Sequence, residues 1–362
     1  MKRLIVCCDG TWDTPLERHA AATTCTNVYR LWRGLARVDG DGADQVAYYH
    51  EGVGTGGLAD RVLGGGFGLG AAADVRACYR FISRHYEPGD ALCVLGFSRG
   101  AFIARSTVGM VRNCGILEPR NLNRLGEAFA FYRDRSRETH PEGQRAEAFR
   151  EQYSYPQAKI HFVGVWDTVG ALGVPVRHPL WRGWWAFHDT ALSSWVSNAF
   201  HAVAIDEQRA PFTPTLWTRP TAPPEQRLEQ VWFTGVHRDV GGGYADPRLA
   251  DITLRWMLLR AQECGLRFEP DRFVLGPDTE YDSPYIDPDP LGELHDSREG
   301  IFKLGRSRPR AMPFGAPADV PRMNQAVAQS AVTRFQSASA GYQPATLARY
   351  LDGPHEVAPV DQ

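Results

Sequence analysis

The chain has 362 residues, of which 43% are hydrophobic and 23% charged. This is the composition of a globular protein, and it excludes a disordered chain, a coiled coil and a fibre. The formal net charge of -2 gives no overall field that would favour nucleic acid or an anionic membrane. We therefore expect no nucleic-acid partner.

Two further absences in the sequence narrow the class of protein. The seven cysteines form no CxxC pair and no metal-like spacing, so we expect buried free thiols, no metal and no disulfides. The apolar run at 4–8 is too short for a signal peptide, and no stretch approaches the ~20 apolar residues of a membrane span. The sequence predicts a cytoplasmic protein without a Sec signal.

In chain order, apolar β-type runs alternate with helical patterns. The expected strands are 4–8, 45–50, 91–97, 160–166 and 231–236, and the expected helices are 27–35, 71–86, a stretch after 98–101 that runs to 111, and 252–264. This alternation predicts an α/β fold with a mostly parallel central sheet flanked by helices. We expect a single domain over 1–362, with a helical insertion at 121–157 and a covering C-terminal segment at 266–362.

The serine candidate is Ser98, in Gly96-Phe97-Ser98-Arg99-Gly100, which matches G-x-S-x-G between an apolar strand and a helix. A serine on such a sharp turn has a strained backbone, and glycines on either side remove the Cβ atoms that would clash. The helix that follows directs N–H groups at the serine, which favours a nucleophile with an oxyanion hole.

A nucleophilic serine needs a base and an orienting acid. His237 follows the predicted strand 231–236 and opens a Gly-rich loop that could reach the serine, and Asp167 ends strand 160–166. The order Ser98, Asp167, His237 is the order expected in α/β-hydrolases. Asp206 and Asp239 are the alternative acids.

The oxyanion hole needs a second N–H beside that of Arg99. Counting back from the serine strand leads to strand 4–8, so the N–H of Gly10 or Thr11 is the candidate. Asp9 either fixes this loop, binds a polar part of the substrate, or is a plain turn residue.

Three other segments have weaker signals. The Gly-rich stretch 52–70 lacks the P-loop Lys and a dinucleotide fingerprint, so we interpret it as a pliable loop beside the site. Trp181, Trp184 and Trp185 form either a lid or acyl-binding wall, or a helix packed on the core. The charged residues 206–209 follow a run that we interpret as helical, and they form either an ion pair or a calcium or substrate contact.

Together these residues resemble a known family, the α/β-hydrolase domain of unknown function 2235, which includes phospholipase effectors of type VI secretion. The motifs are CDGTW (8–12), TNVYRL (26–31), EGVGTG (51–56), GFSRGAFIAR (96–105), VGVWDTVGALG (163–173), AIDEQRAPFTPTLW (204–217) and GVHRDVGGGY (235–244). The resemblance implies an α/β-hydrolase fold and a triad of Ser98, Asp167 and His237 that cleaves carboxylic esters.

The sequence thus favours a serine esterase, lipase or phospholipase that needs no cofactor and acts on a small-molecule or lipid ester. With no basic field, a lipid would be captured by apolar surface near Trp181 to Trp185. The alternatives are an amidase, peptidase or acyltransferase with the same triad, and an inactive hydrolase-like binding scaffold. Export by type VI secretion is an expectation from the resemblance alone.

Overall fold

The core of the molecule is an eight-stranded sheet in which every neighbouring pair is parallel. The computed structural model describes residues 1–10, 25–52, 66–134, 136–155, 158–169, 190–218, 225–273, 286–298, 307–312 and 324–360. In spatial order the strands are β10 (Val357–Ala358), β9 (Gln325–Ala328), β8 (Arg227–Phe233), β7 (Val196–Ala204), β6 (Ile160–Trp166), β3 (Ala91–Phe97), β1 (Arg3–Cys8) and β2 (Gln45–His50). The predicted α/β fold with a mostly parallel sheet is confirmed.

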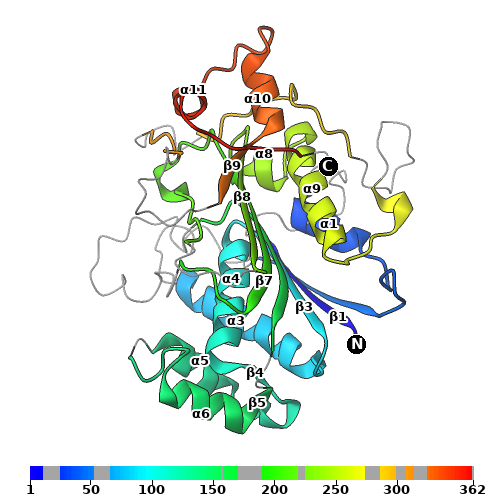
Figure 1. Ribbon diagram of the computed structural model, residues 1–362, viewed down its shortest axis with the longest axis vertical. Coiled ribbons are helices and arrows are strands. Elements are labelled where there is room, and N and C mark those ends of the chain that lie inside the picture. Colours follow the sequence, from blue (N-terminus) through cyan, green and yellow to red (C-terminus); the bar gives the residue numbers. More distant parts are fainter. Residues whose placement is uncertain are drawn as a thin grey trace.

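Helices cover both faces of this sheet (Figure 1). The described helices are α1 (Asn27–Gly34), α3 (Gly66–His85), α4 (Arg99–Cys114), α5 (Leu125–Arg133), α6 (Gln144–Tyr153), α8 (His237–Gly241), α9 (Arg248–Glu263), α10 (Gln329–Gln336) and α11 (Ala345–Asp352). Three short 3-10 helices, η2 (Pro119–Arg124), η3 (Ala210–Phe212) and η4 (Pro270–Arg272), complete the set of described helical segments.

Two apolar cores lie on opposite faces of the sheet. Alternate residues of β1 divide between them: Ile5 packs with α1 and α9, whereas Leu4 and Val6 pack with α3 and α4. Because both faces are buried, the central strands are continuous apolar runs rather than alternating ones. This is why the sequence marks β1 and β3 so clearly.

The insertion after α4 is closed at its base by a small antiparallel pair, β4 (Ile116–Leu117) with β5 (Ser154–Tyr155). Between these strands lie η2, α5 and α6, and α5 packs on α3 and α4. The expected helical insertion at 121–157 therefore corresponds to a unit that starts and ends at one place in the fold.

The run before Asp206 is strand β7 and not the helix expected from the sequence. Its polar residues made it look unlike a buried strand, but Asn198 and His201 both find partners there. Asn198 Nδ2 donates to the His161 carbonyl, and His201 Nε2 accepts from the Thr168 N–H. Satisfied polar groups can stay inside a sheet, so tertiary contacts override the local pattern.

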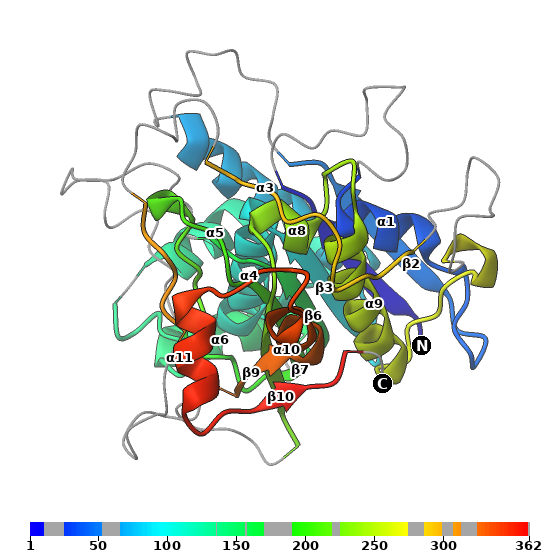
Figure 2. The ribbon, with the colours of Figure 1, turned by 90° about the horizontal axis from the view of Figure 1, so that it is seen from above.

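The C-terminal segment contributes to the sheet as well as covering it. β9 pairs with β8, and β10 pairs with β9, so the chain after residue 324 supplies one edge of the sheet. Figure 2 shows these strands together with α10 and α11 at one side of the molecule.

Candidate active site

Three strands of the sheet end at polar residues on the same edge. β1 is followed by Asp9, β3 by Ser98 and β6 by Asp167. The carboxyl ends of parallel strands meet at one edge, where α/β folds place their ligand sites. His237 lies four residues after the end of β8, which is separated from β6 by β7 in the sheet.

Ser98 has the strained backbone that its motif predicts. Its φ of 58° and ψ of -119° lie outside the regions favoured by L-residues, and it is the N-cap of α4. A Cβ on Gly100 would come within 2.1 Å of the Cys8 carbonyl oxygen, and one on Gly96 within 2.5 Å of the Gly100 oxygen. Both glycines are therefore required for the helix to approach the sheet this closely.

The three predicted catalytic side chains form one hydrogen-bonded chain. His237 Nε2 lies 2.8 Å from Ser98 Oγ, and His237 Nδ1 lies 2.5 Å from Asp167 Oδ2. Ser98 is 9% exposed, His237 4% and Asp167 0%. The arrangement can move a proton from the hydroxyl to the imidazole while the carboxylate holds the other ring nitrogen.

His237 is the first residue of the five-residue helix α8, not part of the flexible loop expected from the sequence. Asp239 explains the difference, because its Oδ2 accepts the Val236 N–H at 3.0 Å and so fixes the helix start. The rings of Phe97 and Phe212 lie 4.7 and 4.9 Å from the imidazole, measured between centroids. The imidazole is thus held between apolar walls.

Asp167 is a fully buried carboxylate that accepts several hydrogen bonds. Oδ1 accepts the Ala204 N–H at 3.0 Å, and Arg310 donates to both oxygens at 2.6 and 2.9 Å. Burial alone would raise the pKa of Asp167, but the charge of Arg310 and the hydrogen bond from His237 outweigh it and hold that pKa well below its usual range. Asp167 is therefore ionised at any physiological pH.

The two alternative acids lie elsewhere. Asp206 Oδ2 accepts the Gly235 N–H and the Tyr342 hydroxyl, and Asp239 Oδ1 lies 2.6 Å from His295 Nδ1. In the charged stretch 206–209, Glu207 pairs with Arg209 at 2.9 Å, which is the ion pair that the sequence favoured. Both aspartates support the loop and helix around His237.

Asp9 binds the Gly10 N–H and two hydroxyls, and the rest of the loop that it was expected to fix, 11–24, lies outside the described residues. Its Oδ1 accepts the Gly10 N–H at 2.7 Å, and its Oδ2 accepts the hydroxyls of Thr26 at 2.6 Å and Tyr49 at 2.5 Å. The expected oxyanion role of Gly10 conflicts with this geometry, because its N–H is directed at a carboxylate. Thr11 lies outside the described residues.

Two other predictions also fall outside the described residues. Trp181, Trp184 and Trp185 lie in the stretch 170–189, and most of the Gly-rich stretch lies in 53–65. Substrate contact by these tryptophans stays a prediction. Within the part of the chain that is described, no helix is long and apolar enough to cross a membrane.

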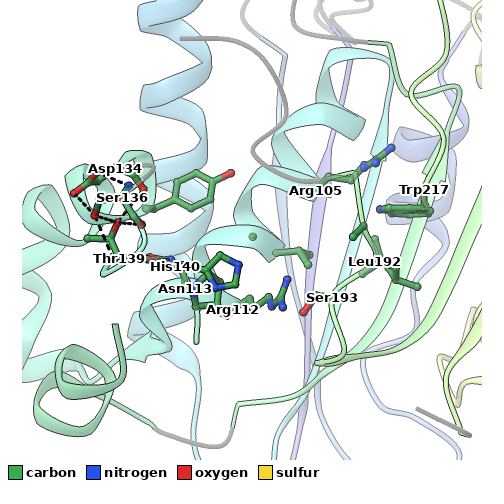
Figure 3. A pocket seen from close by; sticks show the side chains of 16 residues that line it. Arg105, Arg112, Asn113, Asp134, Ser136, Thr139, His140, Leu192, Ser193 and Trp217 are labelled. Carbon is green, nitrogen blue, oxygen red and sulfur yellow. Dashed lines mark hydrogen bonds between the residues drawn. The ribbon is translucent and has the colours of Figure 1, made fainter. Parts of the chain in front are cut away.

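A separate cavity of about 260 Å³ lies between α4 and the insertion (Figure 3). Arg105 and Arg112 of α4 line it, together with His140 from the insertion and Trp217. The described residues around it include none of Ser98, Asp167 and His237. Residues of the insertion therefore line one side of this cavity and residues of α4 another, and α4 is the helix that has Ser98 as its N-cap.

A family model and a curated protein match this chain. A family model described as T6SS, Phospholipase effector Tle1-like, catalytic domain matches residues 2–260. The uncharacterized protein YEL023C of Saccharomyces cerevisiae is 29% identical over 237 residues, which cover 60% of this chain and 33% of the yeast protein.

Two solved structures are also similar. A crystal structure of an uncharacterized protein from Pseudomonas aeruginosa has 20% identity and a TM-score of 0.44, with 74% of this chain and 46% of that chain covered. The Tle1 effector bound to the VgrG spike of the type 6 secretion system has 19% identity and a TM-score of 0.34, with 68% and 52% covered. The chain spans about half the length of these structures, and a third of the yeast relative.

Proposed function

Because the chain belongs to the family of Tle1-like phospholipase effector catalytic domains of type VI secretion, we propose that it is a serine hydrolase of carboxylic esters, with phospholipid-like esters as its substrate class. The observation that carries the proposal is the chain of hydrogen bonds from Ser98 Oγ through His237 to Asp167, built on a strained serine turn. Delivery by type VI secretion stays a prediction.

In this proposal the reaction has two halves. Ser98 Oγ attacks the ester carbonyl carbon while His237 Nε2 takes the hydroxyl proton, and Asp167 stabilises the imidazolium that forms. The ester C–O bond then breaks, and His237 gives its proton to the leaving alcohol. A water molecule, deprotonated by His237, hydrolyses the acyl-serine, which releases the carboxylic acid and returns the proton to Ser98.

The oxyanion of each tetrahedral intermediate lies beside the N-terminus of α4 in this scheme. Arg99 is the first residue of that helix, so its N–H is our first oxyanion donor. Gly10 approaches Ser98 closely, since a Cβ there would lie 3.5 Å from Ser98 Cβ, but Asp9 accepts its N–H. Thr11, the other candidate for the second donor, lies outside the described residues and stays a prediction.

The test compares wild type with Ser98→Ala and with the control Ser106→Ala, which changes another buried serine on the same helix. Substrates are p-nitrophenyl esters of increasing chain length and phospholipid vesicles, and a fluorophosphonate probe reports a reactive serine. We expect Ser98→Ala to lose about 10⁴-fold or more in kcat and all labelling. Activity or labelling of Ser98→Ala equal to that of wild type would refute the proposal. A wild-type protein that neither hydrolyses the esters nor reacts with the probe would favour the inactive scaffold.

A further inference from the structure

The segment 307–312 brings an arginine to the site from outside the matched catalytic domain, which ends at residue 260. Ser307 forms an isolated antiparallel β-bridge with Arg209, and the Arg308 backbone N–H donates to the Gln208 carbonyl at 2.9 Å. The segment therefore runs antiparallel to the stretch after Glu207. Its Arg310 side chain is 4% exposed and reaches Asp167.

Arg310 binds both oxygens of the Asp167 carboxylate. Nη1 donates to Asp167 Oδ1 at 2.6 Å and to the Ala204 carbonyl at 2.7 Å. Nη2 donates to Asp167 Oδ2 at 2.9 Å and to the Phe212 carbonyl at 2.5 Å. Each terminal nitrogen thus gives one hydrogen to the acid and one to the backbone, which holds the guanidinium in the carboxylate plane.

Asp167 consequently has its acceptor capacity filled. A carboxylate offers about four lone-pair sites. Here Oδ1 accepts from Arg310 and the Ala204 N–H, while Oδ2 accepts from Arg310 and His237. Arg310 and His237 do not compete for one position. With three of its four acceptor sites held by groups other than His237, the carboxylate cannot rotate away from the imidazole without breaking several bonds.

We propose that Arg310 is a positioning residue for the reaction: it fixes Asp167 toward His237, and its positive charge offsets that of the carboxylate. This inference rests on the proposed function. A lone carboxylate favours a protonated imidazole, and a cation bound to the same carboxylate opposes that protonation.

The other charged groups near this pair are balanced among themselves. Glu207, which accepts the His237 N–H, is paired with Arg209. Burial lowers the pKa of His201 to about 3, with Arg105 acting in the same direction, so that ring is neutral. Further out, Asp239 lies against His295, and Asp206 faces Tyr342. All of them remain in an Arg310 variant, so the difference from wild type isolates Arg310.

The experiment uses Arg310→Gln, which removes the positive charge, and Arg310→Lys, which keeps the charge but loses the bidentate hydrogen bonds to Asp167. Arg334→Met is the matched control, because Arg334 is also buried and ties the Pro290 and Gly292 carbonyls, away from Asp167. For Arg310→Gln we expect kcat to fall about 10²-fold and the acid limb of the pH–rate profile to move up by about one pH unit. For Arg310→Lys we expect a lower kcat, with the acid limb of the pH–rate profile at the same pH as in wild type.

The control should keep the wild-type profile. An Arg310→Gln profile that superimposes on wild type would overturn the charge role, and an unchanged kcat in Arg310→Lys would overturn the positioning role. If Arg310→Gln does not fold, the Lys variant still tests positioning.

A second readout separates this inference from the proposed function. NMR titration of the His237 ring, assigned with His237→Gln, should show a higher midpoint in Arg310→Gln than in wild type. That result in a protein without esterase activity would refute the proposed function but not the charge effect. Active protein with identical midpoints would refute the charge effect alone.

Discussion

The backbone N–H of His237 donates to Glu207 Oε2 at 3.2 Å, so a buried carboxylate holds the start of the helix that carries the proposed base. Glu207 is itself fixed, because Arg209 donates to both of its oxygens at 2.9 Å and the Ser297 hydroxyl donates to Oε1 at 2.9 Å. Burial would raise the pKa of Glu207, but the hydrogen bonds and the positive charge of Arg209 together outweigh it and lower that pKa. The imidazole is thus positioned through its main chain as well as through Asp167.

Replacing Glu207 with Ala should therefore loosen His237 and leave the half-buried Arg209 with fewer partners. We expect a loss of about 3 kcal/mol in the free energy of unfolding and a fall in kcat of about tenfold or more with little change in KM. Urea denaturation and ester kinetics measure both. Glu127→Ala is the control, since that side chain pairs with Arg124 in an exposed position. Equal behaviour of the two variants would show that Glu207 does not support the base.

The sequence was most informative at the ends of the central strands. Strands 91–97 and 160–166 match β3 and β6 residue for residue, because both are mostly apolar runs ended by a polar residue. Since carboxyl ends of parallel strands meet, the proximity of Ser98 and Asp167 followed from that pattern. The predicted start of β8 was wrong, because the strand begins at Arg227 and not at Val231. In its first part the polar Arg227 and Glu229 alternate with buried residues, so this part does not form an apolar run.

Arg310 was not predicted as part of the site, and Glu207 was predicted only as a member of the charged stretch 206–209, because no local pattern shows what either side chain contacts. Glu207 lies 30 residues from His237, and Arg310 lies 143 residues from Asp167. A charged residue in a short irregular segment usually predicts a solvated surface. What gives these two side chains their role is the close passage of segment 307–312 along the stretch after β7, which is a property of the tertiary structure.

The closest approach of α4 to the sheet gives a prediction on the serine turn. A Cβ on Gly100 would overlap the Cys8 carbonyl oxygen, which is backbone and cannot move aside. We expect Gly100→Ala to push the start of α4 outward, to cost about 2 kcal/mol or more of stability and to abolish labelling of Ser98 by a fluorophosphonate.

Gly126→Ala provides the matched control on α5. A Cβ there meets nothing within 4 Å, so this variant should be neutral or more stable by about 0.5–1 kcal/mol, with full labelling. Normal labelling of Gly100→Ala would mean that the serine turn tolerates a wider gap than the contacts indicate.

Asn27 links the helix after β1 to the helices on the His237 side. Its fully buried Nδ2 donates to the carbonyls of Val240 at 3.1 Å and Ala250 at 2.9 Å, and lies 3.0 Å from Thr253 Oγ1. Asn27→Ala leaves buried acceptors with fewer donors, so we expect a loss of about 2–3 kcal/mol. Because Val240 belongs to α8, kcat should fall as well.

The control for that change is Asn121→Ala. Asn121 makes one side-chain bond, to the Tyr153 carbonyl at 2.9 Å, in a half-buried position of the insertion. It should cost about 1 kcal/mol or less and leave ester hydrolysis unchanged. Unfolding by urea ranks the two variants, and a larger loss in Asn121→Ala would contradict the linking role of Asn27.

Asp206 makes the stability of the fold depend on pH near neutrality. Burial raises the pKa of Asp206 to about 6, although the Gly235 N–H and the Tyr342 hydroxyl act in the opposite direction. In the unfolded chain an Asp titrates near 3.9. Between these two pH values the folded state binds more protons than the unfolded state. The contribution of Asp206 to stability is therefore fully present below about pH 4 and is lost as pH rises through about 6.

Asp206→Asn cannot ionise, and its amide oxygen can accept the two bonds that Oδ2 accepts now. The free energy of unfolding of this variant should therefore rise relative to that of wild type as the pH increases from 4 to 8, by up to about 3 kcal/mol. Asp246→Asn is the control, because the hydrogen bonds from Arg248 lower the pKa of Asp246 to about 2. Its difference from wild type should stay flat from pH 5 to pH 8, since that carboxylate is ionised in both states there. A flat difference for Asp206→Asn over the same range would show that Asp206 is ionised in the folded protein without cost.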